Sequence, residues 1–210
     1  MESDLPRLTA LGPPLTTRIS RLLVAATTAG LIACASAPLT AGKPPAPFTG
    51  DPTRTYALTQ VYLLQASEPA VPDTSVRVRR GVPRVIVLRH PAPDDLTYAE
   101  LVIPAVAFDS TAADSVDVAI HVRPGIYGVD VTTSAPLKSA TLTFKYAVHF
   151  QAPPEARTAF GSDVLFERAL AIGKLGPGET VVFQRSYRPA ADNLSTTLAA
   201  AGSYVVGAPK

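Results

Sequence analysis

The chain of 210 residues has a single cysteine, three histidines, one methionine and no tryptophan. One cysteine excludes an internal disulfide framework, and the spacings of zinc-binding histidines and cysteines are missing. The 21 prolines disfavour a helical bundle, because proline breaks helices. The apolar run from Leu22 to Ala33 is shorter than the roughly 20 residues that span a bilayer as a helix.

What the chain does contain begins with a leader. Arg18 and Arg21 precede the apolar run, and small residues end it, which is the pattern of a secretory signal. The run closes with Leu31-Ile32-Ala33-Cys34, which resembles the lipobox of bacterial lipoproteins. The resemblance implies a signal helix within residues 1–33, cleavage before Cys34 and lipidation of its thiol. An ordinary cleaved signal peptide is the alternative.

The lipobox resemblance also implies a location. A lipidated protein is held at the bacterial cell envelope by its N-terminal lipid, and several acyl chains make that anchor durable. The residue after the cysteine is Ala35 rather than aspartate, which in this family implies the outer membrane, on its periplasmic or surface side. The protein's first expected partner is therefore the membrane itself.

The charge balance excludes one class of partner. A leader ending at Ala33 removes three of the 19 basic and two of the 17 acidic residues, so the mature chain is close to neutral. Binding to nucleic acid requires a basic field, so we expect no nucleic-acid partner.

Composition divides the mature chain into a linker and one domain. Residues 34–53 are rich in proline and have little apolar surface to bury, so we predict a disordered, extended tether. Residues 54–210 are of suitable length for a single domain.

Alternation of apolar and polar residues predicts strands along this domain. The pattern is clearest over 116–122 and 140–150. Val76 and Val78 alternate with arginines, which indicates a half-buried strand. Val85-Ile86-Val87-Leu88 is a continuous apolar run, which predicts a strand buried on both faces.

Other segments are less regular. We predict a long strand over 54–64, a helical turn over 155–159, and strands over 164–175 and 180–187. Residues 193–201 fit either a helix or a strand. Many strands separated by proline and glycine turns predict an all-β fold, a sandwich or a barrel, of which we favour the β-sandwich.

The chain from about Ala99 onward resembles ZU5-like and Ig-like β-sandwich domains of surface proteins. The likeness is carried by Leu101-Val102-Ile103-Pro104, Pro136-Leu137, Ala140–Tyr146, Asn193–Thr196 and Gly202–Val206. The resemblance implies an interaction or scaffold module and no enzymatic activity. The chain lacks the His-Phe-Ser at which some ZU5 domains cleave themselves, and it has Ala201-Gly202-Ser203 at that place.

Motifs for catalysis and for cofactors are missing from the sequence. Gly161-Ser162-Asp163 is not the nucleophile elbow of hydrolases, and Asp94-Asp95 between prolines is typical of a turn. His121 and His149 lie on polar strand faces and would meet if their strands paired, with Asp117 on the face of His121. We expect no metal and no cofactor, and we interpret these residues as solvated strand-face side chains.

One charge cluster remains, formed by Arg77, Arg79 and Arg80. Alternate arginines on a strand can bind carboxylates or phosphates, so an anionic glycan or lipid head group is one candidate partner. A solvated face or a guarded sheet edge is the alternative. We therefore expect a non-catalytic envelope lipoprotein that binds an envelope protein or an anionic glycan, or adds structure. An exported hydrolase and a small-ligand carrier with a barrel cavity are the competing hypotheses.

Overall fold

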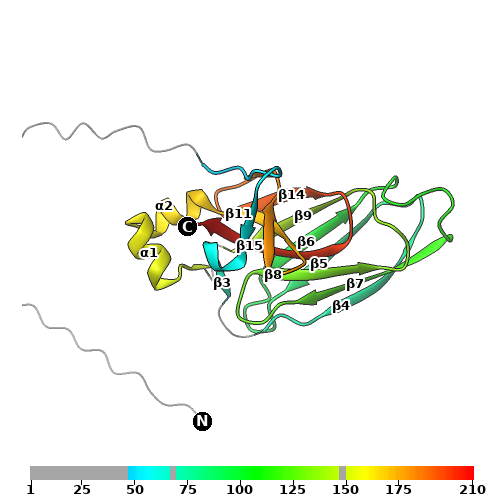
Figure 1. The fold of residues 1–210 in the computed structure, drawn as a ribbon. Coiled ribbons are helices and arrows are strands. Elements are labelled where there is room, and N and C mark those ends of the chain that lie inside the picture. The colour runs from blue at the N-terminus through cyan, green and yellow to red at the C-terminus, as the bar shows by residue number, and fades with distance from the viewer. Residues whose placement is uncertain (1–46, 67–69, 147–149) are drawn as a thin grey trace, which may run out of the picture. The chain divides into compact units, whose positions relative to one another are not determined.

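The computed structural model describes residues 47–66, 70–146 and 150–210, which all belong to one compact unit, Pro44–Lys210. The predicted signal peptide and Cys34 lie outside the described residues, and so does most of the predicted tether. Within the described ranges the fold is all-β and sandwich-like, as predicted, with antiparallel sheets and two short helices (Figure 1).

The larger sheet has eight strands. Seven of them follow one another in the order β1 (Thr55–Ala57), β12 (Thr180–Phe183), β11 (Ala171–Gly176), β15 (Gly202–Pro209), β8 (Gly128–Thr133), β7 (Ser115–Val122) and β4 (Thr74–Arg79). The eighth, β2 (Val61–Leu63), pairs with the C-terminal part of β15.

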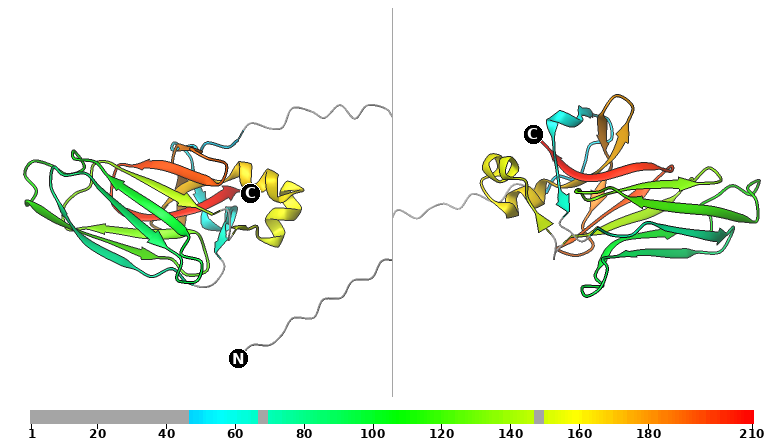
Figure 2. Two further views of the ribbon diagram at one scale, coloured as in Figure 1. Left: turned by 180° about the vertical axis from the view of Figure 1, so that it is seen from behind. Right: turned by 90° about the horizontal axis from the view of Figure 1, so that it is seen from below.

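The second sheet has five strands in the order β13 (Ser186–Tyr187), β14 (Asn193–Leu198), β9 (Ala140–Lys145), β6 (Thr97–Ile103) and β5 (Arg84–Arg89). A small two-stranded sheet joins β3 (Gln65–Ala66) to β10 (Phe150–Gln151). The helices α1 (Pro154–Phe160) and α2 (Asp163–Ala169) lie together at one end of the sheets (Figures 1 and 2).

The two large sheets share one apolar core. In β7 the buried residues are Val116, Val118 and Ile120, and in β9 they are Ala140, Leu142 and Phe144. Period-two alternation places each set on one face of its strand, and both sets belong to the same buried cluster. The sequence-based assignment of faces in these two strands is confirmed.

Aromatic side chains fill the centre of this core. Tyr98 from β6 stacks on Tyr127 at a centroid distance of 5.0 Å, and Phe144 meets Tyr98 edge-on at 5.9 Å. All three side chains are buried. Such aromatic pairs stabilise a fold beyond the area that they bury.

The predicted long strand over 54–64 is wrong in one respect. It is broken by a 3-10 turn, η1 (Leu58–Gln60), into β1 and β2. β1 pairs with β12, whereas β2 pairs with β15. The turn lets one stretch of chain serve two partner strands of the same sheet.

The prediction of a strand over 164–175 holds only for its second half. Ser162 accepts a hydrogen bond from the Leu165 N–H at 3.2 Å and caps α2, which runs to Ala169 before β11 begins. The serine of Gly161-Ser162-Asp163 is thus a helix cap. Of residues 193–201, left open as helix or strand, residues 193–198 form β14, and the helical turn expected over 155–159 lies within α1.

The predicted strand over 180–187 divides between the two sheets. β12 pairs with β1 and β11 in the larger sheet, while β13 pairs with β14 in the smaller one. Ser186 secures the crossing, because its hydroxyl oxygen accepts from the Ile172 N–H at 2.9 Å and its hydroxyl donates to the Gln184 carbonyl.

The continuous run Val85–Leu88 was predicted to be buried on both faces, and that prediction is wrong. β5 is the last strand of its sheet, and it buries only Ile86 and Leu88. Val85 and Val87 point away from the core and are 52% and 36% exposed. Burial of both faces requires a covering layer on each side, and within the described residues only the inner face of β5 is covered.

The last residues assigned to the tether contact the domain. The Phe48 N–H donates to the Arg168 carbonyl at 2.9 Å, and the Thr49 carbonyl accepts from the Ser186 N–H at 2.7 Å. The Phe48 ring meets Phe183 edge-on at 5.5 Å. Phe48 and Thr49 are therefore part of the folded domain rather than free linker.

Candidate functional site

The predicted arginine cluster lies on β4, at the edge of the larger sheet. Arg77 and Arg79 share the exposed face of the strand, as the alternation predicts. Arg77 lies opposite Asp117 of β7, and its Nε donates to the Asp117 carboxylate at 2.8 Å. This contact lowers the pKa of the Asp117 carboxyl. The guanidinium of Arg77 is thus already occupied by a carboxylate of its own chain.

The other two arginines differ from each other. Arg80 donates from its Nη2 to Asp114 at 3.0 Å, so it too has an acidic partner. Arg79 lies opposite Ser115 and makes no ion pair with another described residue. The structure brings the three arginines together on one strand end, but two of them are neutralised by neighbouring aspartates.

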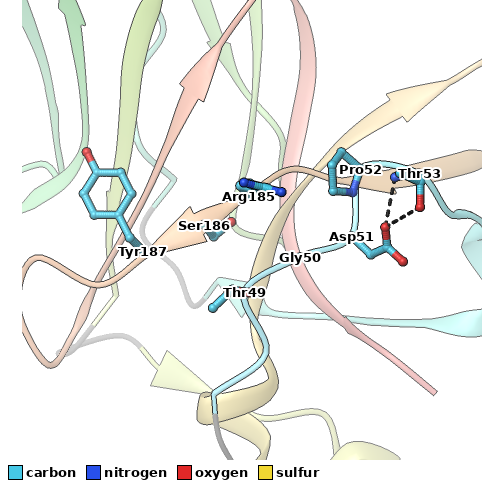
Figure 3. A pocket seen from close by; sticks show the side chains of 8 residues that line it. All are labelled: Thr49, Gly50, Asp51, Pro52, Thr53, Arg185, Ser186 and Tyr187. Atoms are coloured by element: carbon cyan, nitrogen blue, oxygen red, sulfur yellow. Dashed lines mark hydrogen bonds between the residues drawn. The ribbon is translucent and has the colours of Figure 1, made fainter.

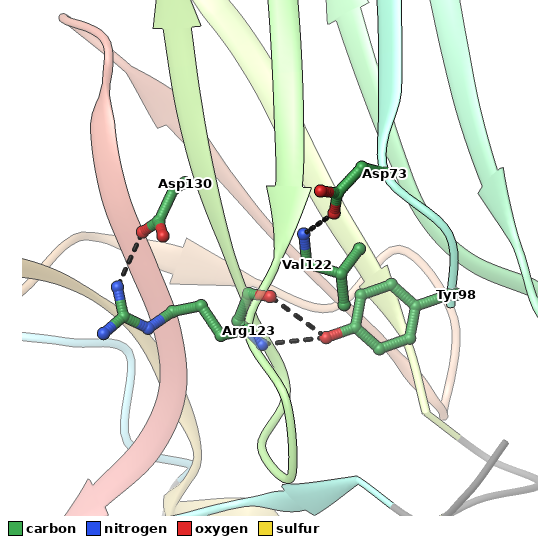
Figure 4. A network of polar contacts seen from close by, with 6 residues as sticks. Asp73, Tyr98, Val122, Arg123 and Asp130 are labelled. Carbon is green, nitrogen blue, oxygen red and sulfur yellow. Dashed lines mark hydrogen bonds and ion pairs between the residues drawn. The ribbon is translucent and has the colours of Figure 1, made fainter. Parts of the chain in front are cut away.

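The polar face of the larger sheet continues as a row of ion pairs. His121 lies on the same exposed face of β7 as Asp117, as predicted, and its Nδ1 lies 2.9 Å from Asp73 Oδ2. Asp73 also accepts from the Val122 N–H at 2.8 Å, and Arg123 donates to Asp130 at 2.7 Å (Figure 4). The hydrogen bond from His121 and that from the Val122 N–H lower the pKa of the Asp73 carboxyl.

Of the other two histidines, only His90 belongs to the described residues, and it does not extend this row. His149 lies outside the described residues, so a meeting with His121 stays a prediction. His90 is buried and packs edge-on against Tyr98 at a centroid distance of 5.6 Å. The parts of the chain that the structure describes contain no cluster of three or more histidine, cysteine or acidic side chains that could hold a metal ion.

Tyr98 holds the turn between β7 and β8. Its hydroxyl accepts from the Gly128 N–H at 2.8 Å, and the Gly128 and Ile126 carbonyls lie 3.2 and 3.3 Å away as acceptors (Figure 4). Burial raises the pKa of the Tyr98 hydroxyl, so it stays protonated at neutral pH. This is a structural role, because every partner of the hydroxyl is backbone.

A shallow cavity of about 450 Å³ lies where the N-terminal segment meets β13 (Figure 3). Residues 49–53 form one side of it and residues 185–187 the other. Its one carboxylate, Asp51, accepts hydrogen bonds from the backbone and hydroxyl of Thr53 at 3.0 and 2.7 Å. The cavity thus has one arginine, Arg185, and one carboxylate that is already bound within its own turn, which is not an arrangement for acid–base chemistry.

The most distinctive surface is apolar and lies on the hairpin of β5 and β6. Eight large hydrophobic side chains are exposed among the described residues, and six belong to this hairpin or the turns beside it. They are Val82, Val85, Val87, Leu96, Val102 and Val106. We call this set the valine surface. Exposed apolar side chains that occur singly are ordinary, so their concentration around one hairpin makes this surface the candidate interaction site.

The strand register shows why Val85, Val87 and Val102 lie together. Val85 of β5 is directly opposite Val102 of β6, so both point to the outer face of the sheet. Val87 lies two residues further along the same face. Val82 and Val106 belong to the turns next to this pair, at the start of β5 and the end of β6, and they are 49% and 75% exposed.

The signal for this surface in the sequence was the continuous apolar run over residues 85–88, the same run that predicted a strand buried on both faces. A continuous valine and isoleucine run fits either a central strand or an edge strand with one uncovered apolar face. The two cannot be separated without knowing the neighbours of the strand. Val102 and Val106 belong to no recognisable binding motif in the sequence.

No helix in the described part of the chain is long and apolar enough to cross a membrane. Comparisons with protein-family models, with curated proteins and with solved structures gave no match.

Proposed function

We propose that this protein is a lipoprotein of the bacterial cell envelope, attached at Cys34 to the outer membrane, whose β-sandwich is a non-catalytic binding module. Its binding site is the valine surface. The observation that carries the proposal is that six of the eight exposed large hydrophobic side chains among the described residues lie on the β5–β6 hairpin or in the turns beside it.

The rest of the domain fits a binding role better than a catalytic one. The aromatic core is packed and buried, and the polar face of the larger sheet consists of short ion pairs between side chains of the same chain. Ion pairs of this kind on a surface add little stability, but they leave few charged groups available for a ligand. The side chains of the valine surface, in contrast, are not covered by any other described part of the chain.

The attachment of the domain also supports an anchored module. The Pro-rich segment after Cys34 leads into Phe48 and Thr49, which are bonded to α2 and β13. A tether that ends in a fixed contact presents the domain at a distance from the membrane without loosening its fold. The anchor itself is tested by replacing Cys34 with serine, which cannot form the thioether. Radiolabelled fatty acid on that variant would contradict the proposal.

The binding site is tested with a photo-crosslinking amino acid placed in the anchored protein of intact cells. At Val102, on the outer face of β6, we expect a discrete crosslinked species. The matched control is Thr132, which is exposed on the central strand β8 of the larger sheet and should give none. Equal crosslinking at both positions, or none at Val102, would refute the valine surface as the binding site.

A further inference from the structure

The edges of the two large sheets differ in how they are protected against added strands. An edge strand presents unpaired N–H and C=O groups, and proteins usually guard it by shortness or by charged side chains. β13 and β1 are only two and three residues long. β4 is six residues long, but its outer face carries Arg77 and Arg79. Three of the four strands that end a sheet order therefore follow the usual pattern, as does the three-residue branch strand β2.

The fourth edge, β5, does not follow it. It is also six residues long, with no proline inside the strand, and its outer face carries Val85 and Val87. Its backbone bonds to β6 on one side, and no other described residue supplies a backbone partner along Arg84–Leu88. A register shift between Leu88 and Arg89 limits the regular part of the edge to its first five residues.

Charge distinguishes the two ends of this edge. Arg84 begins the strand, and Arg79 lies across the turn from it. Neither arginine makes an ion pair with another described residue. At the other end Arg89 donates to the Asp95 carbonyl at 2.9 Å, with the Asp95 carboxylate 3.9 Å away. The strand itself contains no acidic residue. A partner would therefore gain most from a carboxylate near the start of β5.

We propose that β5 binds its partner by strand addition, and that the partner is an extended protein segment with alternating apolar side chains and an acidic residue at the end that meets Arg84. This inference rests on the proposed binding role of the valine surface. Backbone hydrogen bonds to the open edge hold the segment, and its apolar side chains continue the row of Val102 and Val85. The carboxylate fixes its direction.

A second copy of the same chain fits this edge less well. Two β5 strands that keep their outer faces on the same side, paired antiparallel about Ile86, would bring Arg84 of one copy opposite Leu88 of the other. Arg84 would then meet an apolar side chain instead of a carboxylate. Because β5 contains no acidic residue, a second copy would leave both Arg84 side chains without the counter-charge that the proposed segment supplies.

The experiment uses the full anchored protein in detergent and a synthetic probe. The probe is a peptide of alternating valine and threonine with glutamates at one end, and its counterpart carries lysines in their place. We expect the glutamate peptide to bind more tightly, with affinity that falls as salt is added. Alternate amides of Arg84–Leu88 should become protected from hydrogen exchange when it binds. Arg84→Glu should weaken binding by about tenfold or more, because it replaces an attraction by a repulsion.

Two controls separate the alternatives. Arg185→Glu makes the same charge change at an exposed arginine of the β12–β13 connection and should leave affinity unchanged. Two peptides that are N-methylated at alternate positions, each along a different edge, should differ in affinity. The reason is that only one edge of the bound peptide makes backbone hydrogen bonds to β5. If both bind as well as the unmethylated peptide, strand addition is refuted while the valine surface remains a binding site. If the protein forms a dimer without peptide and its β5 amides are protected there, the occupant of the edge is a second copy instead. If the glutamate peptide does not bind, the inference is also refuted.

Discussion

Gly50 is the residue through which the N-terminal segment is held on the domain, and its replacement is the sharpest test of that contact. Its φ is +84°, and a Cβ at this position would lie 1.9 Å from the Gln184 carbonyl oxygen. No real side chain tolerates that distance from a backbone atom. We therefore expect Gly50→Ala to detach the N-terminal segment with Phe48 and Thr49 from the domain, and to leave the strands beneath it undeformed.

The size of the effect follows from the contacts that would be lost. These are the hydrogen bonds Phe48 N–H to Arg168 and Ser186 N–H to Thr49, and the edge-on packing of Phe48 on Phe183. Each contributes about 1 kcal/mol. The freed segment regains some conformational entropy, so the net loss should be about 2–3 kcal/mol. For a domain of this size that is a fall in Tm of roughly 5–10 °C.

The assay compares Gly50→Ala with Gly161→Ala by thermal unfolding and amide exchange. Gly161 has a similar φ of +76° but open space around its Cβ position, so alanine there costs only the left-handed backbone, about 1 kcal/mol. The Ser186 amide should exchange faster in Gly50→Ala alone. Equal melting temperatures with a protected Ser186 amide in both variants would refute the expected release, and a Ser186 amide that exchanges freely in the unaltered protein would return residues 47–53 to the tether.

Three further predictions concern the core and the polar faces. Phe144→Ala should lower the free energy of unfolding by about 3–5 kcal/mol. Thr141→Ala should cost little, because Thr141 lies on the outer face of β9 and makes no side-chain hydrogen bond to any described residue. Similar losses for both variants in denaturant titrations would show that the faces are misassigned. Tyr98→Phe should cost about 1–3 kcal/mol, since a buried glycine N–H loses its acceptor, and an unchanged denaturation midpoint would count against that role. Arg77→Glu combined with Arg79→Glu should leave crosslinking at the valine surface unchanged; its loss in a folded double variant would point to the arginine face instead.

Local periodicity was sufficient for much of the fold. The alternation in β7 and β9 specifies which side chains are buried, because successive residues of any strand point to opposite faces. The all-β class followed from the same pattern combined with frequent proline and glycine turns. Pro104 ends β6 at Ile103 because proline cannot donate to a ladder. These conclusions depend only on residues close together in the chain.

The candidate site could not be found in that way. An arginine pattern on β4 predicted an exposed face correctly, but not that Asp117 and Asp114, more than thirty residues away, would occupy two of its guanidinium groups. The sequence by itself determined which faces of the strands are apolar. Tertiary structure alone decided whether such a face is covered, because coverage depends on the order of strands in a sheet. Phe48 is packed and Val85 is exposed for that one reason: a distant element lies over the first, and none among the described residues lies over the second.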